Sequence, residues 1–166
     1  EMQRVKQMLR IKIPANVHAE TGAVAWLMEM DTWDLAGFKN ADEALLRDVM
    51  RWLWSLMLAS MFDDAACIHG VILVEAFGNM GISGMIAWES SFKPVTADMN
   101  EMFYGASPFK LRECFVVDSP CWMSVLIMLG RLFQSKRVRE MFKNRSVCST
   151  QHYMGGIDQL PNGCFG

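Results

Sequence analysis

The chain of 166 residues lacks an apolar run long enough to cross a bilayer. Its longest such stretch, Trp52 to Phe62, is interrupted by serine and bounded by Arg51 and Asp63. A membrane-spanning helix needs roughly 20 consecutive apolar residues, so we expect none here. Charged residues are also sparse, at 20% against 52% hydrophobic ones, a balance that is typical of one globular domain and excludes a disordered chain.

Cysteine is scarce and irregularly spaced. The five cysteines are odd in number and contain no CxxC pair, and no signal peptide opens the chain. We therefore expect a reduced, cytoplasmic protein and no disulfide framework. The cysteines are Cys67, Cys114, Cys121, Cys148 and Cys164.

Histidine is rarer still, and its three copies are too dispersed to indicate a metal site. Cys148, His152 and Asp158 form a conceivable Cys-His-Asp set. A catalytic cysteine needs a positioned base and an oxyanion donor, and no nucleophile elbow accompanies these residues. We therefore expect no enzyme, and a Cys-dependent hydrolase stays only as an alternative.

Net charge is close to zero, at −2, but it is unevenly distributed. Residues 1–100 carry 8 Lys/Arg against 13 Asp/Glu, whereas residues 101–166 carry 8 against 5. A local basic patch can meet an anionic surface. Nucleic acid is not expected as the partner, because no binding motif or interleaved exposed aromatics accompany the patch. Its cations are Arg131, Lys136, Arg137, Arg139, Lys143 and Arg145.

Methionine is abundant, with 15 copies. Its flexible, polarizable side chain suits a cavity that adapts to varied apolar shapes, and it equally suits ordinary core filling. Composition alone leaves both interpretations open.

Apolar runs of strand length alternate with segments of helical period along the chain. This alternation predicts an α/β fold with a largely parallel sheet. We expect helices at 2–11, 41–62 (with Asn40 as the cap), 94–106 and 120–132, and strands at 22–30, 70–74, 108–118 and 144–150, with a connector at 15–21 and an ambiguous segment at 85–91.

The stretch from Pro108 to Arg145 contains the features that indicate a function most directly. Its buried strand closes with Asp118-Ser119-Pro120, a sequence that predicts the start of a helix. That helix is apolar almost all round from Cys121 to Leu129, and the basic patch follows it. A helix without a polar face must be buried or must contact lipid, and cations at its end suit anionic headgroups.

Four motifs follow one another along the chain. They are Trp33-Asp34, Gly70-Val71 with Glu75-Ala76-Phe77-Gly78, Pro108-Phe109-Lys110 with Asp118-Ser119-Pro120, and Leu160-Pro161. In their order and spacing, these motifs resemble the CRAL-TRIO lipid-binding domain of the retinaldehyde-binding and tocopherol-transfer proteins. The departures include Leu35, Glu75 and Asp118 in place of the family's Pro, Asp and Asn, Phe115 in place of a common His, and Gly163 in place of Glu.

The resemblance implies a domain at residues 20–166, preceded at residues 1–19 by a remnant of the family's helical region and a connector. It implies a mostly parallel sheet flanked by helices, enclosing an apolar cavity closed by a mobile gate helix that begins at Pro120. The expected function is binding and transfer of a retinoid, tocopherol or phosphoinositide lipid, without another cofactor, by a cytoplasmic protein that is peripheral at membranes. A noncatalytic interaction domain without a cavity is the alternative.

The resemblance also assigns residues, position by position, to two sites. The expected cavity lining is Met99, Met102, Phe103, Phe109, Leu111, Cys114, Met123, Leu126 and Ile127. For contact with phosphoinositide or membrane, the resemblance assigns Lys110 and Arg137, and the basic patch adds Arg131, Lys136 and Arg139. A further basic position of the family falls on Met141.

Overall fold

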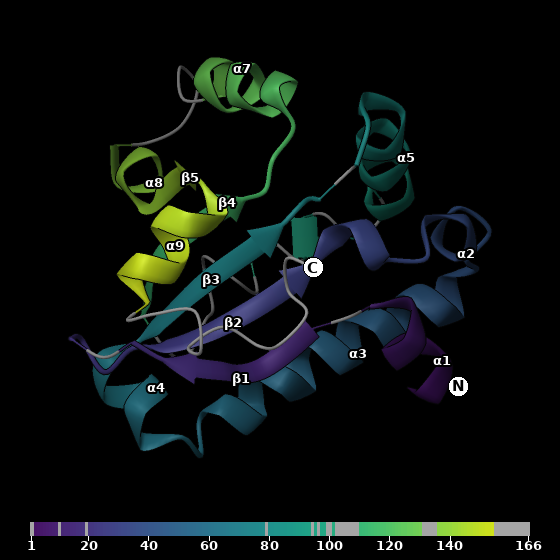
Figure 1. Ribbon diagram of the computed structural model, residues 1–166. Helices are drawn as coiled ribbons and strands as arrows, with labels where there is room; N and C mark the ends of the chain where they lie inside the picture. Colours follow the sequence, from purple (N-terminus) through teal and green to yellow (C-terminus); the bar gives the residue numbers. More distant parts are fainter. Residues whose placement is uncertain are drawn as a thin grey trace.

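A computed structural model describes residues 2–9, 11–18, 20–78, 80–93, 95, 97–98, 101, 110–130 and 136–154. Helices and strands alternate through most of this part of the chain (Figure 1). The elements are α1 (Met2–Met8), β1 (Ile11–Val17), β2 (Val24–Glu29), the 3-10 turn η1 (Met30–Thr32), α2 (Leu35–Lys39), α3 (Glu43–Ser60), α4 (Asp64–His69), β3 (Val71–Ala76), α5 (Ile82–Phe92), β4 (Leu111–Val117), α7 (Cys121–Gly130), α8 (Lys136–Met141), β5 (Phe142–Arg145) and α9 (Val147–Tyr153).

The strands form one five-stranded sheet in the order β1-β2-β3-β4-β5. Strands β2 to β5 run parallel, and β1 pairs with β2 antiparallel. Leu27, Val74 and Phe115 are aligned across the three central strands and are fully buried. Such continuous apolar runs are typical of parallel strands that are covered on both faces. The expectation of an α/β fold with a largely parallel sheet is therefore confirmed.

Helices cover both faces of the sheet, and alternate residues of each strand enter different cores. Trp26 and Leu73 belong to the larger core, which also contains the buried face of α3 and residues of α1 and α7. Leu27 and Val74 belong to the smaller core on the opposite face. Met154, the residue that follows α9, is fully buried in this core. The larger core accounts for the wide apolar face of the longest helix.

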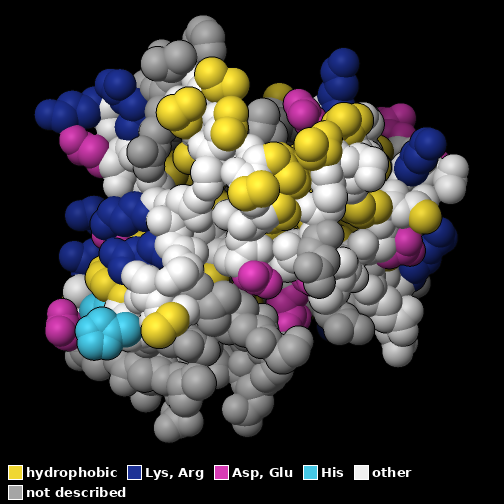
Figure 2. Space-filling view, turned by 45° about the horizontal axis from the view of Figure 1, so that its top comes forward, with side chains coloured by type: hydrophobic (Ala, Val, Ile, Leu, Met, Phe, Trp, Pro, Cys, Tyr) yellow, Lys and Arg dark blue, Asp and Glu magenta, His cyan; other side chains and the backbone are white. Residues whose placement is uncertain are grey.

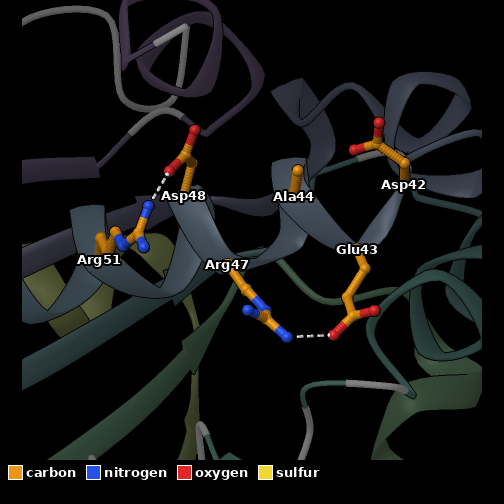
Figure 3. A pocket seen from close by; sticks show the side chains of 6 residues that line it. All are labelled: Asp42, Glu43, Ala44, Arg47, Asp48 and Arg51. Atoms are coloured by element: carbon orange, nitrogen blue, oxygen red, sulfur yellow. Dashed lines mark hydrogen bonds and ion pairs between the residues drawn. The ribbon is translucent and has the colours of Figure 1, made fainter.

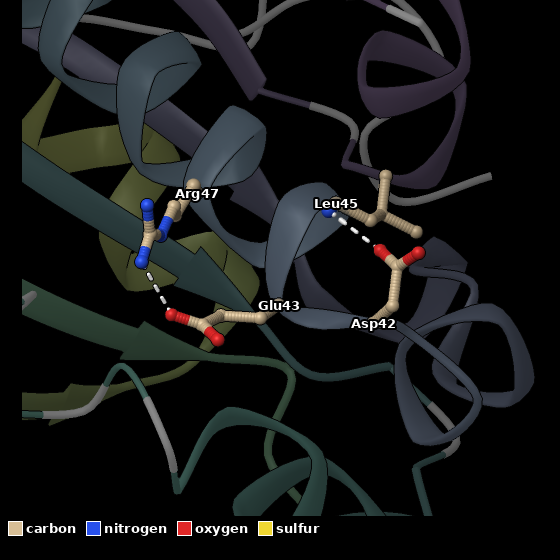
Figure 4. A network of polar contacts seen from close by, with 4 residues as sticks. All are labelled: Asp42, Glu43, Leu45 and Arg47. Atoms are coloured by element: carbon tan, nitrogen blue, oxygen red, sulfur yellow. Dashed lines mark hydrogen bonds and ion pairs between the residues drawn. The ribbon is translucent and has the colours of Figure 1, made fainter.

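The N-cap of helix α3 lies two residues later than the cap proposed from sequence. Asp42, rather than Asn40, is the N-cap, and its carboxylate accepts a hydrogen bond from the Leu45 amide at 2.8 Å. Glu43 takes no part in this cap. Its carboxylate forms an ion pair with Arg47, one turn along the helix, at 2.5 Å (Figure 4). An aspartate cap satisfies an otherwise unpaired amide at the helix start, typically worth about 1 kcal/mol.

The N-terminal region contains a strand where a helix end and a connector were expected. Residues after α1 form β1, which lies at the edge of the sheet and carries Pro14. Proline lacks an amide hydrogen, so within sheets it is confined to edges and irregularities. The pairing of β1 with β2 does shift register between Lys12 and Asn16. The predicted end of the helix at 2–11 and the start of the connector at 15–21 are therefore wrong, because Ile11–Val17 is an edge strand.

Two further differences follow from local capping. Asp63 caps α4 through the amides of Ala65 and Ala66, so the predicted break after α3 is a short turn into another helix. Near the C-terminus, the strand predicted at 144–150 ends at Arg145, because Ser146 caps α9. The ambiguous segment at 85–91 is helical and belongs to α5.

Candidate functional site

Helices α5 and α7 follow the carboxyl ends of two adjacent parallel strands, β3 and β4. The chain leaves β3 through Gly78, whose φ of 52° is readily adopted by glycine, and leaves β4 through Asp118 at φ 51°. Both helices then stand at the same side of the molecule, at the top of Figure 1. The carboxyl end of a parallel sheet is where ligands bind in open α/β folds, so this end is the candidate site.

One side of α7 packs into the larger core. Met123 is 4% exposed, and Trp122 and Ile127 are half-buried against the same cluster of side chains. Cys114 on β4 is fully buried in that core, and the half-buried Leu111 packs against it. Four expected lining residues, Leu111, Cys114, Met123 and Ile127, therefore contribute to one continuous apolar cluster.

The remaining expected lining residues do not take part in the contacts that the structure describes. Met99, Met102, Phe103 and Phe109 lie outside the described residues, as does most of the helix predicted at 94–106. Leu126 belongs to α7, but its side chain is outside the described part. A wall opposite α7 therefore stays a prediction.

The other side of α7 is apolar as well, although it faces outward. Val125, Met128 and Leu129 are 51%, 61% and 48% exposed. Ile82 and Ile86 on α5 are also exposed. Figure 2 shows hydrophobic side chains gathered on this face of the molecule. We name these five side chains the α5–α7 apolar surface.

Cations lie beside this surface. Lys136 and Arg139 are exposed on α8, which follows α7 in the chain. Lys110 is also exposed, but it lies at the amino end of the parallel strands, where its carbonyl accepts a hydrogen bond from the Val71 amide, and so it is not brought together with α5 and α7. Lys136 pairs with Glu140 at 3.9 Å, with both side chains open to solvent, so the pair is worth little. Arg137 lies on α8 with its side chain outside the described part, and Arg131 lies outside the described residues.

The family's further basic position falls on Met141, which is buried. A cation there would be removed from water, so the methionine suits the position in this chain. An anion-binding site here therefore lacks a contribution from this position.

Lys143 and Arg145 differ from the rest of the predicted basic patch, because internal partners hold them. Lys143 donates a hydrogen bond to the carboxylate of Glu113. The Arg145 guanidinium lies 4.7 Å from the Phe115 ring centre and 4.5 Å from that of Tyr153. Burial raises the pKa of Tyr153, and its hydrogen bond to Glu113 raises it further. These two cations are part of the packing of β5 against β4 and α9.

A candidate functional residue that was not predicted from the sequence is Glu75 on β3. It lies between Met28 and Val116 of the neighbouring strands, on the face that carries Leu73. Burial raises its pKa to about 7, although a hydrogen bond from the Cys114 thiol lowers it. Burial also raises the pKa of Cys114 well above its ordinary value, as does the neighbouring Glu75. The sequence signal was one carboxylate inside the run Val-Ile-Leu-Val-Glu-Ala-Phe.

The conceivable catalytic set is not assembled by the described residues. Cys148 and His152 are both exposed and lie one turn apart on α9, while Asp158 is outside the described part. A nucleophile and its base must lie within hydrogen-bond reach, and the structure gives no such contact between these two.

An open hollow of about 560 Å³ lies elsewhere, on the N-terminal half of α3 (Figure 3). Its lining contains the two ion pairs Glu43–Arg47 and Asp48–Arg51, so it is polar. Ligand pockets for small molecules are concave and mostly apolar, so we do not assign the expected lipid cavity to this hollow.

No protein-family model and no curated protein sequence matches this chain. Among the described residues, no helix combines the length and apolarity that crossing a bilayer requires.

Proposed function

We propose that this chain binds one small apolar lipid between α7 and the sheet and exchanges it at anionic membranes. The observation that carries the proposal is the apolar character of α7 on both sides. Met123 and Ile127 pack inward, whereas Val125, Met128 and Leu129 face outward. The motifs that resemble the CRAL-TRIO domain support the same proposal, with α7 as its gate helix.

On the outer side, contact with a bilayer removes apolar surface from water. The three exposed side chains of α7 and two of α5 would enter the boundary between headgroups and acyl chains, as interfacial helices do. Lys136 and Arg139 would face anionic headgroups, each contributing on the order of 1 kcal/mol. That sum suits transient docking.

On the inner side of α7, the carboxyl group of Glu75 favours one class of lipid ligand over others. With a pKa of about 7, its carboxyl group is substantially protonated near neutral pH and can donate or accept a hydrogen bond. An apolar lipid with an uncharged polar end, such as a hydroxyl or carbonyl group, matches this environment better than a fully ionised lipid.

The test combines native mass spectrometry of the purified protein with exchange of a fluorescent lipid analogue between vesicles. We expect a lipid adduct in the wild type. We also expect that Val125→Asp with Met128→Asp keeps the adduct but abolishes exchange with vesicles containing phosphatidylserine. Ile68→Asp on α4 is the matched control, because Ile68 is exposed and apolar but lies away from α5 and α7.

The gate assignment has a separate readout. Opening of α7 exposes Met123 and Ile127, and lipid can solvate them where water cannot. Amide hydrogen exchange across Cys121–Gly130 should therefore accelerate when anionic vesicles are added to lipid-free protein. A protein without lipid adduct, vesicle binding or faster exchange is an interaction domain without a cavity, and the proposal is then wrong.

A further inference from the structure

A second exposed apolar surface lies at the far side of the molecule from α5 and α7, where α3 ends and α4 begins (Figure 1). Phe62 is 91% exposed and Ile68 is 74% exposed, and Trp54, Leu58 and Met61 are each about two-fifths exposed or more. We name these five side chains the α3–α4 apolar surface. A single exposed apolar residue needs no explanation, but a contiguous group marks an interaction site.

The spacing of these residues is that of a helix pairing with another helix. Arg51, Trp54, Leu58 and Met61 follow one another at steps of three, four and three residues. This alternation averages 3.5 residues and keeps one seam of a helix facing a partner helix. The buried face of α3 uses other positions, including Leu53 and Met57, so the seam is a second face of the same helix.

The charges at the two ends of the seam differ in sign. Arg51 precedes it, with its side chain 71% exposed, and Asp64 follows it on α4. Asp63 is also acidic and caps α4. Two carboxylates beside Phe62 disfavour an anionic membrane as the occupant of this surface. A surface with a cation at one end and an anion at the other complements its own inverted copy.

We propose that the α3–α4 apolar surface pairs with the same surface of a second copy of this chain, with the two α3 helices antiparallel about a two-fold axis near Leu58. This register sets Trp54 opposite Met61 of the second copy. It also brings Arg51 towards the turn where α3 ends and α4 begins with Asp64 in the second copy.

The ion pair between Arg51 and Asp48 on the same helix does not oppose this register. Its distance is 2.8 Å, but the arginine side chain is largely open to solvent. Exposed pairs of this kind contribute little, so Arg51 can exchange or share its partner at small cost. The axis lies on the side of the molecule away from α5 and α7, so the dimer leaves the α5–α7 apolar surface open.

The first test is sedimentation velocity over a wide range of protein concentration. We expect a reversible monomer–dimer equilibrium whose dissociation constant rises about tenfold or more in Leu58→Glu, because a central apolar contact is replaced by two like charges. Ile86→Glu, on the exposed face of α5, is the matched control and should leave the equilibrium unchanged. Leu58 is exposed, so circular dichroism and the melting temperature should stay those of the wild type.

The second test distinguishes the antiparallel register from any other contact. Arg51→Asp and Asp64→Arg should each weaken the dimer, and the double variant should restore it, because the swapped charges again meet across the axis. A monomer at every concentration overturns the proposal. A dimer that resists Leu58→Glu also overturns it, as does binding of this surface to phosphatidylcholine vesicles that Leu58→Glu abolishes while the protein stays monomeric.

Discussion

The thiol of Cys114 hydrogen-bonds the carboxyl group of Glu75 from the neighbouring parallel strand, within the larger core of the sheet. Glu75 raises the pKa of the Cys114 thiol, whereas the hydrogen bond from this thiol lowers the pKa of Glu75. The thiol is too deeply buried to ionise, so it acts as a donor. The carboxyl group holds its proton to about pH 7. This pair is a polar contact among the apolar side chains of the larger core.

The stability of the protein should therefore fall as pH rises from about 4.5 to about 7. The folded state binds the Glu75 proton more tightly than the unfolded state, so this stabilisation is complete below pH 4.5 and is lost as pH passes 7. A full shift corresponds to about 3 kcal/mol, and residual solvent contact makes the effect smaller. Urea unfolding across this pH range should show the loss in the wild type and a flatter profile in Glu75→Gln. Glu43→Gln on the exposed face of α3 should keep the wild-type slope.

The two sides of α7 should respond differently to truncation. Met123→Ala removes a buried side chain and should lower the free energy of unfolding by about 2–3 kcal/mol. Met128→Ala removes an exposed one and should change it by less than about 0.5 kcal/mol. Chemical denaturation measures both. Equal destabilisation by the two variants would contradict an α7 with one buried and one exposed apolar side.

Charge reversal on α8 should weaken docking to anionic vesicles. Lys136→Glu with Arg139→Glu removes about 2 kcal/mol of attraction and adds repulsion, so binding should weaken by roughly thirtyfold or more. The wild-type affinity should fall as salt is raised, since exposed charges are screened beyond about 8 Å at physiological ionic strength. Vesicle sedimentation measures both effects. Lys39→Glu on α2 supplies the control, and sedimentation equal to the wild type in the α8 double variant would rule out docking through these cations.

Arg145 should act on stability and not on membrane docking. Its guanidinium lies over the rings of both Phe115 and Tyr153, so Arg145→Ala should cost about 1–2 kcal/mol of unfolding free energy. Vesicle binding should stay at the wild-type level. Arg139→Ala should show the reverse pattern, because Arg139 is exposed. Weaker vesicle binding in Arg145→Ala, with unchanged stability, would show that this arginine belongs to the basic patch.

Local sequence determined the elements whose signals are short-range. The apolar runs that became β2, β3 and β4 were recognisable because strands buried on both faces contain few polar residues. The start of α7 was recognisable from Asp118-Ser119-Pro120, because a proline fits the first turn of a helix. These signals sufficed for the α/β class and the largely parallel sheet.

Tertiary structure decided what depends on neighbours that are distant in sequence. Pro14 lies in a strand because β1 is at an edge of the sheet, a place that no local pattern specifies. Lys143 and Arg145 do not belong to the predicted basic patch, because β4 and α9 place Glu113, Phe115 and Tyr153 in contact with them. Glu75 acquired its raised pKa from the core around it. Charge, burial and hydrogen bonding act through space, so the same residue types had different roles once the chain had folded.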